Sequence, residues 1–366
     1  MFKGRVSVIT QRHKKHIRHL KIDFPIDVLG SGAVLLGPNV TCDGFHADRT
    51  TRVQTHIHSD HMEDFTTSLR GQMIMTKATR RLLELEHPAL PSRTNVRVLD
   101  YSEEWEYEGD RIQLLSSDHS LGAAQVKVTM PDGRSLGYSG DFNWPLDNVM
   151  QVNALVVDAT YGNPNSRIHC SQEKAQEALV DLIRKKLRRG PVHLMGDTGP
   201  LERALLVLNM AGIIDEVPVI GNKRTCWHAK VYQEFSQPMP NILSDDTEDA
   251  RDAIRTNRYI RIWSLHGRLP NDGLYEGAVV RLTKYRTTAE PVERINEGVF
   301  HVGFSNHADF AGTIEYVQAT GASFVVTDNH RGEVNGRAER LAKMLRTQLG
   351  ISSRVSSNME SRKWGR

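Results

Sequence analysis

Thr55-His56-Ile57-His58-Ser59-Asp60-His61 is the stretch that decides the fold, because it places four potential metal ligands within six consecutive residues. The four residues before it can end a strand, and side chains in an extended chain alternate between two faces, so His56 and His58 point the same way. Asp60 and His61 come just past that strand end and can turn toward a second ion. Imidazole and carboxylate suit zinc, manganese or iron, so these ligand types alone do not select the metal.

Two further candidate ligands follow at predicted strand ends. His119 precedes a glycine turn and an alternating segment at 124–129. Pro131-Asp132-Gly133 then predicts a hairpin into a second strand at 136–142. Asp141 therefore comes at a strand end beside a glycine, where a carboxylate can leave the sheet and bridge two cations.

Two late motifs add the remaining candidates. Phe304-Ser305-Asn306-His307-Ala308-Asp309 and Val325-Val326-Thr327-Asp328-Asn329-His330 each follow or end an apolar run. A lone histidine or aspartate at such a place is usually structural, and a histidine-rich surface loop is the plain alternative for residues 55–61. The number and the order of these residues favour a metal centre.

This order of motifs resembles the metallo-β-lactamase fold. Asp158-Ala159-Thr160-Tyr161-Gly162 and the motif around His307 are similar to signatures of the β-CASP nucleases, the nucleic-acid-processing branch of that fold. The likeness is greatest to short bacterial and archaeal exonucleases, which include ligase-associated DNA exonucleases and proteins like mRNA 3'-end processing factors. It covers about residues 27–345. The last motif departs from the usual H-G-E, because Arg331 stands between His330 and the glycine.

The resemblance implies an α/β chain with a four-layer αββα core that is split by an inserted α/β β-CASP domain. We expect the core to comprise 1–168 and 299–366, the insertion to comprise 169–298, and the active site to lie between them. A capping serine at 171 opens a predicted helix that runs to Gly190. Strands and helices then alternate up to residue 235, which indicates a parallel α/β unit. Residues 352–366 are expected to form a polar tail, with a short strand at 353–355 as the alternative.

The resemblance also implies the chemistry, a two-metal phosphodiesterase with metal-bound hydroxide as its nucleophile. Zinc is the expected metal and manganese the alternative. His307 would be the general acid and Asp158 would orient its ring, while Asp43 would hold the far nitrogen of a ligating histidine. Asp60 counts both as a ligand and as a catalytic group. The two ions would be held by His56, His58 and His119 on one side, by Asp60, His61 and His330 on the other, and by Asp141 between them.

Composition agrees with an ordinary enzyme. The 366 residues are enough for two domains or for one domain with an insertion, and no apolar run approaches the length of a membrane span. The basic N-terminal segment at 11–19 is not followed by the apolar stretch of a secretory signal. Three widely spaced cysteines argue against a disulfide framework, so we expect a cytoplasmic protein.

The expected partner is DNA or RNA. The net charge of only +3 does not by itself indicate a nucleic-acid-binding protein. The basic run 184–189 fits a solvated helix end as well as a phosphate contact, and 196–200 fits a phosphate-binding helix start as well as a plain turn. A homodimer, or association with repair or processing proteins, is compatible with the sequence. The choice between DNA and RNA, and between exonuclease and endonuclease, stays open. Two other classes compete: a small-molecule metallo-hydrolase acting on a thioester or lactone, and a metal-free subunit of a processing complex.

Overall fold

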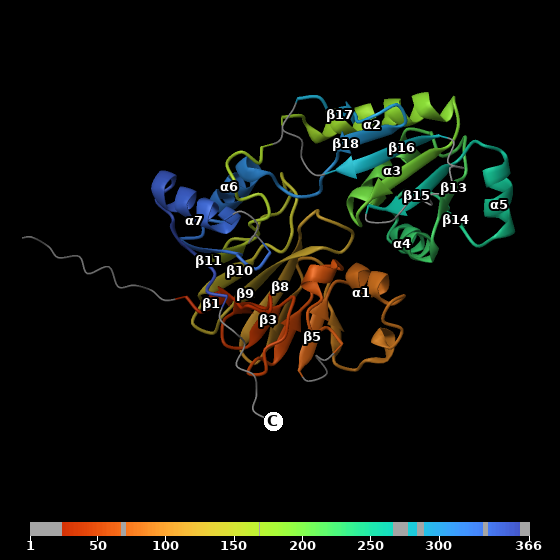
Figure 1. Cartoon of the computed structure of the whole chain (residues 1–366). Helices are drawn as coiled ribbons and strands as arrows, with labels where there is room; N and C mark the ends of the chain where they lie inside the picture. The colour runs from red at the N-terminus through yellow and green to blue at the C-terminus, as the bar shows by residue number, and fades with distance from the viewer. Residues whose placement is uncertain are drawn as a thin grey trace, which may run out of the picture.

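Three β-sheets organise the chain (Figure 1). The computed structural model describes residues 24–66, 71–167, 169–265, 277–283, 289–331 and 336–358. The basic segment 11–19 and the Gly332-Glu333 part of the last motif lie outside these ranges. Within them the expected α/β class is confirmed, with a four-layer core and an inserted α/β domain.

Two of the sheets pack face to face and form the core. Their facing side chains are almost wholly apolar, and many have no exposed surface, as at Val34, Ile112 and Val126. The first sheet has the order β1 (Ile26–Val28), β2 (Val34–Leu36), β3 (Val40–Cys42), β4 (Thr51–Val53), β5 (Gln72–Met75) and β6 (Val96–Val98). The second has the order β20 (Ser352–Val355), β19 (Phe324–Thr327), β11 (Ala154–Val157), β10 (Ser135–Tyr138), β9 (Ala124–Thr129), β8 (Asp110–Ser116) and β7 (Glu104–Tyr107).

Helices cover the outer faces of this core. α6 (Phe310–Ala319) and α7 (Arg337–Gln348) pack their apolar sides on the second sheet, through residues such as Tyr316 and Leu341. α1 (Lys77–Leu83) lies beside the first sheet, and its N-cap Thr76 accepts a hydrogen bond from Thr79 N. Two short 3-10 turns, Ser59–His61 and Leu90–Ser92, complete this half of the molecule.

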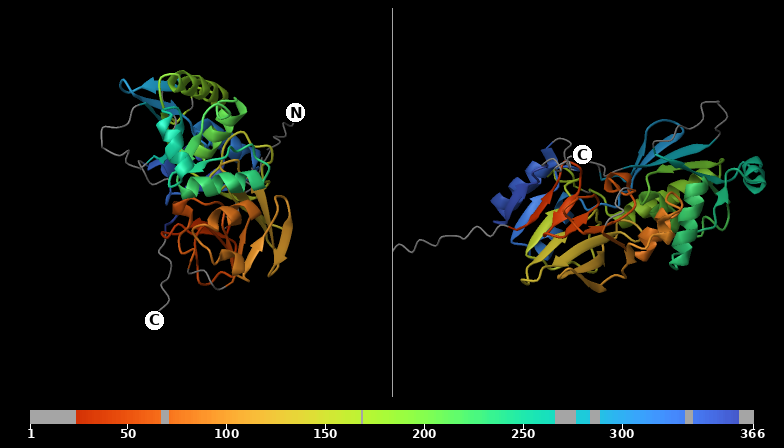
Figure 2. Two further views of the ribbon diagram at one scale, coloured as in Figure 1. Left: turned by 90° about the vertical axis from the view of Figure 1, so that its right-hand side faces the viewer. Right: turned by 90° about the horizontal axis from the view of Figure 1, so that it is seen from below.

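The third sheet belongs to the insertion, which lies beside the two-sheet core in both views of Figure 2. Its strands are parallel except for β17, as the alternation of strands and helices predicts. The sheet has the order β14 (Leu243–Ser244), β13 (Val219–Gly221), β15 (Ile260–Ser264), β12 (Val192–Gly196), β16 (Ala278–Thr283), β18 (Val299–Gly303) and β17 (Val292–Arg294). Its helices are α2 (Gln172–Leu187), α3 (Pro200–Met210), α4 (Lys223–Glu234) and α5 (Glu248–Arg255).

Helix α2 shows why this half folds as the sequence predicts. Its N-cap Ser171 accepts a hydrogen bond from Lys174 N, and its buried residues Ala175, Leu179 and Ile183 recur every four positions along one face. Such a stripe packs a helix against a sheet. No helix in the described part of the chain is both long enough and apolar enough to cross a bilayer.

The structure corrects the sequence-based expectation in three places. Val299–Gly303, expected in the return to the core, is β18 and pairs with β16 in the third sheet, so the chain crosses back after Gly303. Helix α7 was not expected, although its residues 338, 341, 342 and 345 form a buried stripe. Ser352–Val355 is a strand paired with β19 rather than the start of a polar tail.

Candidate metal centre and cleft

The histidine-rich stretch leaves the core at the end of β4 and turns through Ser59–His61. His56 and His61 are buried, His58 is partly buried, and the Asp60 side chain is 62% exposed. The strand before the turn has no exposed residue, and His56 and His61 continue into the interior of the protein rather than into solvent. This placement excludes the plain surface-loop interpretation of residues 55–61.

Four predicted ligands from three separate segments converge on one point. One ligand atom each from His56, His58, His119 and Asp141 lies within 4.8 Å of the others. Asp141 Oδ2 is 3.6 Å from both His56 Nε2 and His119 Nε2, and His119 Nε2 is 3.1 Å from His58 Nδ1. Two atoms bound at about 2.1 Å to one tetrahedral zinc ion lie roughly 3.4 Å apart, so these separations match a shared ion.

The chemistry of these groups also fits a cation. His56 Nε2 is buried and makes no hydrogen bond within the described residues, which is a costly state for a polar atom. Burial lowers the pKa of His56, His58 and His119, and their rings are therefore neutral near pH 7. Burial acts to raise the pKa of Asp141, but His61 and His307 outweigh it and hold that pKa well below its usual range. Neutral imidazoles around an ionised carboxylate are the state that a divalent metal binds.

Asp43 fixes the histidine-rich turn by hydrogen bonds to Thr55 and His61. Its carboxylate is fully buried and accepts hydrogen bonds from Thr55 N (2.8 Å) and Thr55 Oγ1 (2.6 Å). Asp43 Oδ2 also lies 2.7 Å from His61 Nδ1, which leaves His61 Nε2 directed to Asp141 Oδ1 at 3.2 Å. Burial and Arg331 oppose protonation of His61, but Asp141 and Asp43 outweigh them and raise its pKa to about 10.

His307 and Asp158 form a second pair, which lies beside Asp141. His307 Nδ1 is 3.3 Å from Asp158 Oδ2, and His307 Nε2 is 3.7 Å from Asp141 Oδ2. The other Asp158 oxygen accepts a hydrogen bond from Thr160 N, so this carboxylate both closes a turn and faces the ring. One ligand atom from each of the three groups also falls within 4.8 Å of the others, so the arrangement itself permits either an acid or a ligand role for His307.

The last predicted ligand, His330, is not gathered with the others. No group of three or more potential ligands in the described ranges contains it, and the same holds for Asp60, whose Oδ2 is 3.8 Å from His61 Nε2. The His330 ring lies against Gly32, where an added Cβ would be 2.8 Å from Nε2. The extra residue Arg331 turns inward instead.

Arg331 fills the space beneath the turn that carries Asp60. Its side chain is 4% exposed and pairs with Asp328 at 2.9 Å. It also donates to the backbone carbonyls of Gly32 (3.1 Å) and Asp60 (3.3 Å). Arg331 therefore joins the loop after β19 to the turns at Gly32 and Asp60. The family resemblance did not indicate this role.

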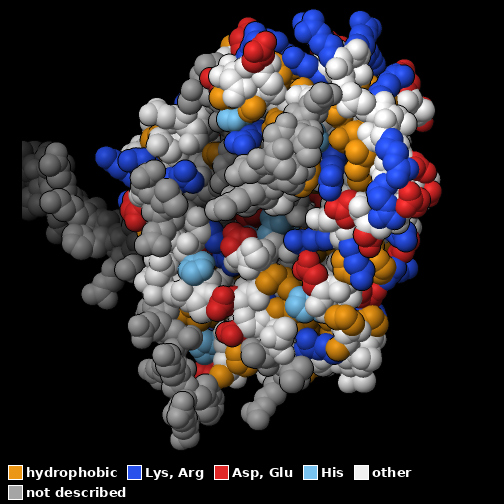
Figure 3. Space-filling model, turned by 45° about the vertical axis from the view of Figure 1, so that its right-hand side comes forward, with side chains coloured by type: hydrophobic (Ala, Val, Ile, Leu, Met, Phe, Trp, Pro, Cys, Tyr) orange, Lys and Arg blue, Asp and Glu red, His pale blue; other side chains and the backbone are white. Residues whose placement is uncertain are grey.

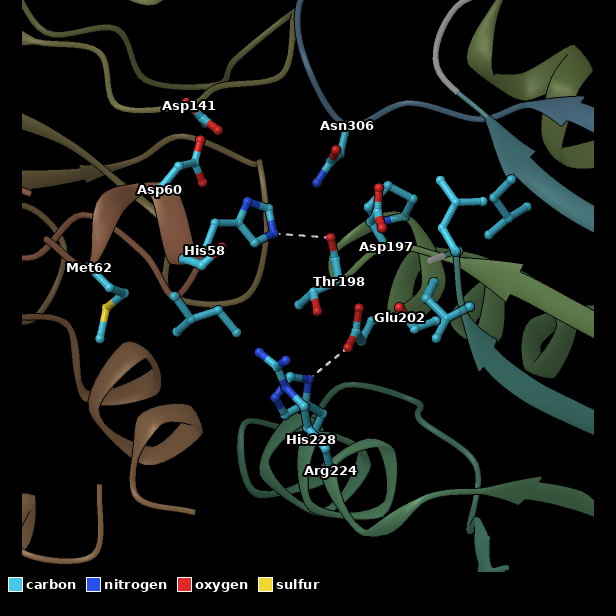
Figure 4. Close-up of a pocket in the computed structure, with 18 of the residues that line it drawn as sticks. His58, Asp60, Met62, Asp141, Asp197, Thr198, Glu202, Arg224, His228 and Asn306 are labelled. Carbon is cyan, nitrogen blue, oxygen red and sulfur yellow. Dashed lines mark hydrogen bonds and ion pairs between the residues drawn. The ribbon is translucent and has the colours of Figure 1, made fainter. Parts of the chain in front are cut away.

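A cleft of about 880 Å³ lies between the core and the insertion (Figure 3). The candidate site residues that line it are His58, Asp60, Asp141 and His307. The insertion side of the cleft contributes Thr198, Glu202, Arg224 and His228, which Figure 4 shows opposite His58 and Asp60. His228 Nδ1 lies 2.7 Å from Glu202 Oε1, and both side chains are buried. The sequence had indicated Thr198 only as part of a possible phosphate-binding loop, and it gave no role to Glu202, Arg224 and His228, which belong to no recognisable motif.

Comparison with known proteins agrees with this arrangement. No family model matches the chain. It is 35% identical over 108 residues to an uncharacterised protein in the lig 3' region of Acidianus ambivalens, a match that covers 29% of this chain and 76% of that protein. It is 29% identical over 149 residues to the DNA cross-link repair protein SNM1 of Arabidopsis thaliana, a match that covers 38% of this chain and only 30% of that longer relative.

A solved structure shares the fold across most of the chain. A protein of unknown function from Enterococcus faecalis V583 superposes with a TM-score of 0.58 at 13% identity. The match covers 85% of this chain and 80% of that one. At this identity the likeness concerns the fold alone.

Asp43→Asn should weaken metal binding and lower stability together. The amide keeps one acceptor oxygen and replaces the other with a donor, so either Thr55 N or the pair formed by Thr55 Oγ1 and His61 Nδ1 would lose its acceptor. We expect a roughly 10–100-fold loss of metal affinity and about 1–3 kcal/mol less free energy of unfolding. Metal titration and urea unfolding measure the two effects. Asp110→Asn, at a buried carboxylate bonded to Asn39, is the control and should keep the metal affinity. Wild-type affinity in Asp43→Asn would contradict the assignment.

Proposed function

Because this chain belongs to the β-CASP family of metallo-β-lactamase nucleases, we propose that it is a metal-dependent phosphodiesterase that cleaves DNA or RNA. The observation that carries the proposal is that Asp141 faces both a set of buried histidines and the His307–Asp158 pair. The first set suits a cation and the second suits proton transfer. Phosphodiester cleavage needs both, at positions a few ångströms apart.

We propose that the residues hold two divalent ions, zinc or manganese, in the half-sites that the sequence suggests. One would be held by His56, His58 and His119, the other by Asp60, His61 and His330, with Asp141 shared. When bound, such ions relieve charge on the phosphoryl oxygens and lower the pKa of water. Asp60, whose side chain is 62% exposed, lies at the rim of the cleft, whereas most of the other proposed ligands are buried.

His307 is the proposed general acid. Its Nε2 faces the same carboxylate oxygen as His56 and His119, and the ring is 17% exposed, so a substrate oxygen can reach it. A carboxylate beside Nδ1 favours the protonated ring and fixes its orientation. The proton held at Nε2 would pass to the leaving oxygen of the cleaved strand.

The competing functions differ in what they need. A small-molecule hydrolase acting on a thioester or lactone uses the same ligand run, but it has no use for an insertion that forms one whole side of a cleft of about 880 Å³. A metal-free binding subunit has no need to keep all seven predicted ligands. We further propose exonuclease action, which fits the likeness to short exonucleases. We also propose that the protein associates with itself or with repair or processing proteins.

A nuclease assay with and without chelator tests the proposal. Single-stranded and double-stranded DNA and RNA, labelled at either end, should be cleaved only by metal-loaded protein, and the products should show the polarity. Cleavage of a thioester or lactone without cleavage of any nucleic acid would favour the hydrolase. Inactivity on all of them, with no metal bound, would favour the binding subunit.

Metal content provides the next prediction. The purified protein should carry close to two divalent ions per chain by elemental analysis. Asp141→Asn should remove most of both, because it removes the shared charge, whereas His330→Ala should cost only one. Full metal retention and turnover in His330→Ala would show that this histidine serves the packing against Gly32 and that the second ion has another ligand.

His307→Ala separates proton transfer from metal binding. The variant should keep its metal and fold but lose roughly 10²–10⁴ in rate, and the loss should shrink for a p-nitrophenyl phosphodiester, whose leaving group needs no proton. Asp158→Asn should show a smaller defect that is not additive with the first, since both act on one ring. Loss of a metal ion in His307→Ala, or equal slowing of both substrates, would contradict the acid role.

A further inference from the structure

The outward nitrogens of two proposed metal ligands are bound by the insertion and by the segment that returns from it to the core. His58 Nε2 lies 3.1 Å from the backbone oxygen of Thr198, in the loop before α3 (Figure 4). His119 Nδ1 lies 3.1 Å from the backbone oxygen of Asn306, just after β18. Asn306 Nδ2 donates in return to the His119 carbonyl at 2.7 Å, so this contact is made in both directions.

These carbonyls fix which nitrogen of each ring carries its proton. A carbonyl oxygen can only accept, so His58 must be protonated at Nε2 and His119 at Nδ1. The opposite nitrogens, His58 Nδ1 and His119 Nε2, are then the ones with lone pairs, and they lie 3.1 Å apart on the side of Asp141. Such outer hydrogen bonds orient a ligating ring and raise its basicity. The orientation of His58, a core residue, therefore depends on the insertion, and that of His119 depends on the segment that joins the insertion to the core.

The loop that supplies the Thr198 carbonyl is held in place by a buried polar chain. Gly199 has a φ of +93°, and a Cβ there would lie 2.3 Å from Asn306 Nδ2, so only glycine fits. Gly199 N donates to Glu202 Oε2 at 2.5 Å, and the other oxygen of Glu202 lies 2.7 Å from His228 Nδ1. Glu202 and His228 are 3% and 4% exposed, and they connect the loop to both α3 and α4.

We propose that this unit, made of Thr198, Gly199, Glu202, His228 and Asn306, couples the packing of the insertion against the core to metal retention. Its members are positioning residues, because they reach the ion only through His58 and His119. The coupling is reciprocal: closing the contact strengthens metal binding, and bound metal stabilises the closed contact by the same factor. The inference rests on the proposed ligand role of the two histidines but not on the identity of the substrate.

Gly199→Ala, compared with Gly212→Ala, tests the coupling. Both glycines have positive φ values and flank the same helix α3, but the Cβ at position 212 would meet only Asp215 Oδ2 at 3.9 Å. Both variants place an alanine at a positive φ, and only the first brings its Cβ against Asn306 and displaces the loop. We expect about 10–100-fold weaker zinc binding for Gly199→Ala in competition with a chelating dye, and wild-type binding for Gly212→Ala.

Glu202→Ala provides a second variant if Gly199→Ala fails to fold. It frees Gly199 N and His228 without a clash, and zinc affinity should fall by a smaller factor. Glu216→Ala is its matched control, because Glu216 makes an exposed ion pair with Arg258 within the insertion and does not contact the core histidines. Zinc affinity should be unchanged in that variant.

Hydrogen exchange of the wild-type protein tests the reverse direction. Removal of zinc should accelerate exchange of the backbone amides at 197–203 more than at the distal end of α3. Wild-type zinc affinity in folded Gly199→Ala or Glu202→Ala, or an equal loss in the controls, would overturn the coupling. So would wild-type protein that binds no zinc. Tight zinc binding that obeys these predictions without any nuclease activity would instead leave the coupling intact and overturn the proposed function.

Discussion

The buried carboxylate of Asp43 is the interaction on which the candidate site depends. A carboxylate with no exposed surface is tolerable only if its oxygens are hydrogen-bonded, and here the donors come from Thr55 and His61 at the two ends of the histidine-rich turn. The requirement to satisfy one buried charge therefore fixes the shape of that turn. His119 and Asp141, which follow strands of the second sheet, converge on the position that this turn defines.

Local patterns explain why the sequence predicted so much of this. A spacing such as H-x-H at a strand end determines which way side chains point, and Ser171 and the apolar stripe of α2 determine where that helix begins and which side it buries. His56, His58, His119 and Asp141 were identified in this way and are brought together in the structure. Their roles as ligands, like those of His307 and Asp158, remain predictions for the experiments above.

Longer-range features had no such local signal. The contact from Thr198 to His58 uses a backbone carbonyl, which every residue possesses, and it spans 140 positions. Asn306 stood inside a recognised motif, but its role depends on the backbone of His119, which only the folded chain brings near. The extra residue of the last motif, Arg331, has a side chain that turns inward beneath the loop carrying Asp60, and nothing in the motif indicated that contact. The expected boundary of the insertion at residue 298 left β18 outside the third sheet for a related reason, because the sequence of a strand does not show which strand it pairs with.

The charges that line the cleft indicate how these parts work together. Among the described residues, six carboxylates line it, from Asp60, Asp64, Glu86, Asp141, Asp197 and Glu202, against one guanidinium, from Arg224. Arg224 is paired with Glu86 and His228 with Glu202, so these two groups of the described insertion side are already compensated. Cations held by the core histidines would reverse this balance at the point where a phosphodiester must bind. Under the proposed function, ions held there would contribute to substrate binding as well as to cleavage, so the positions of His58 and His119 would matter for both.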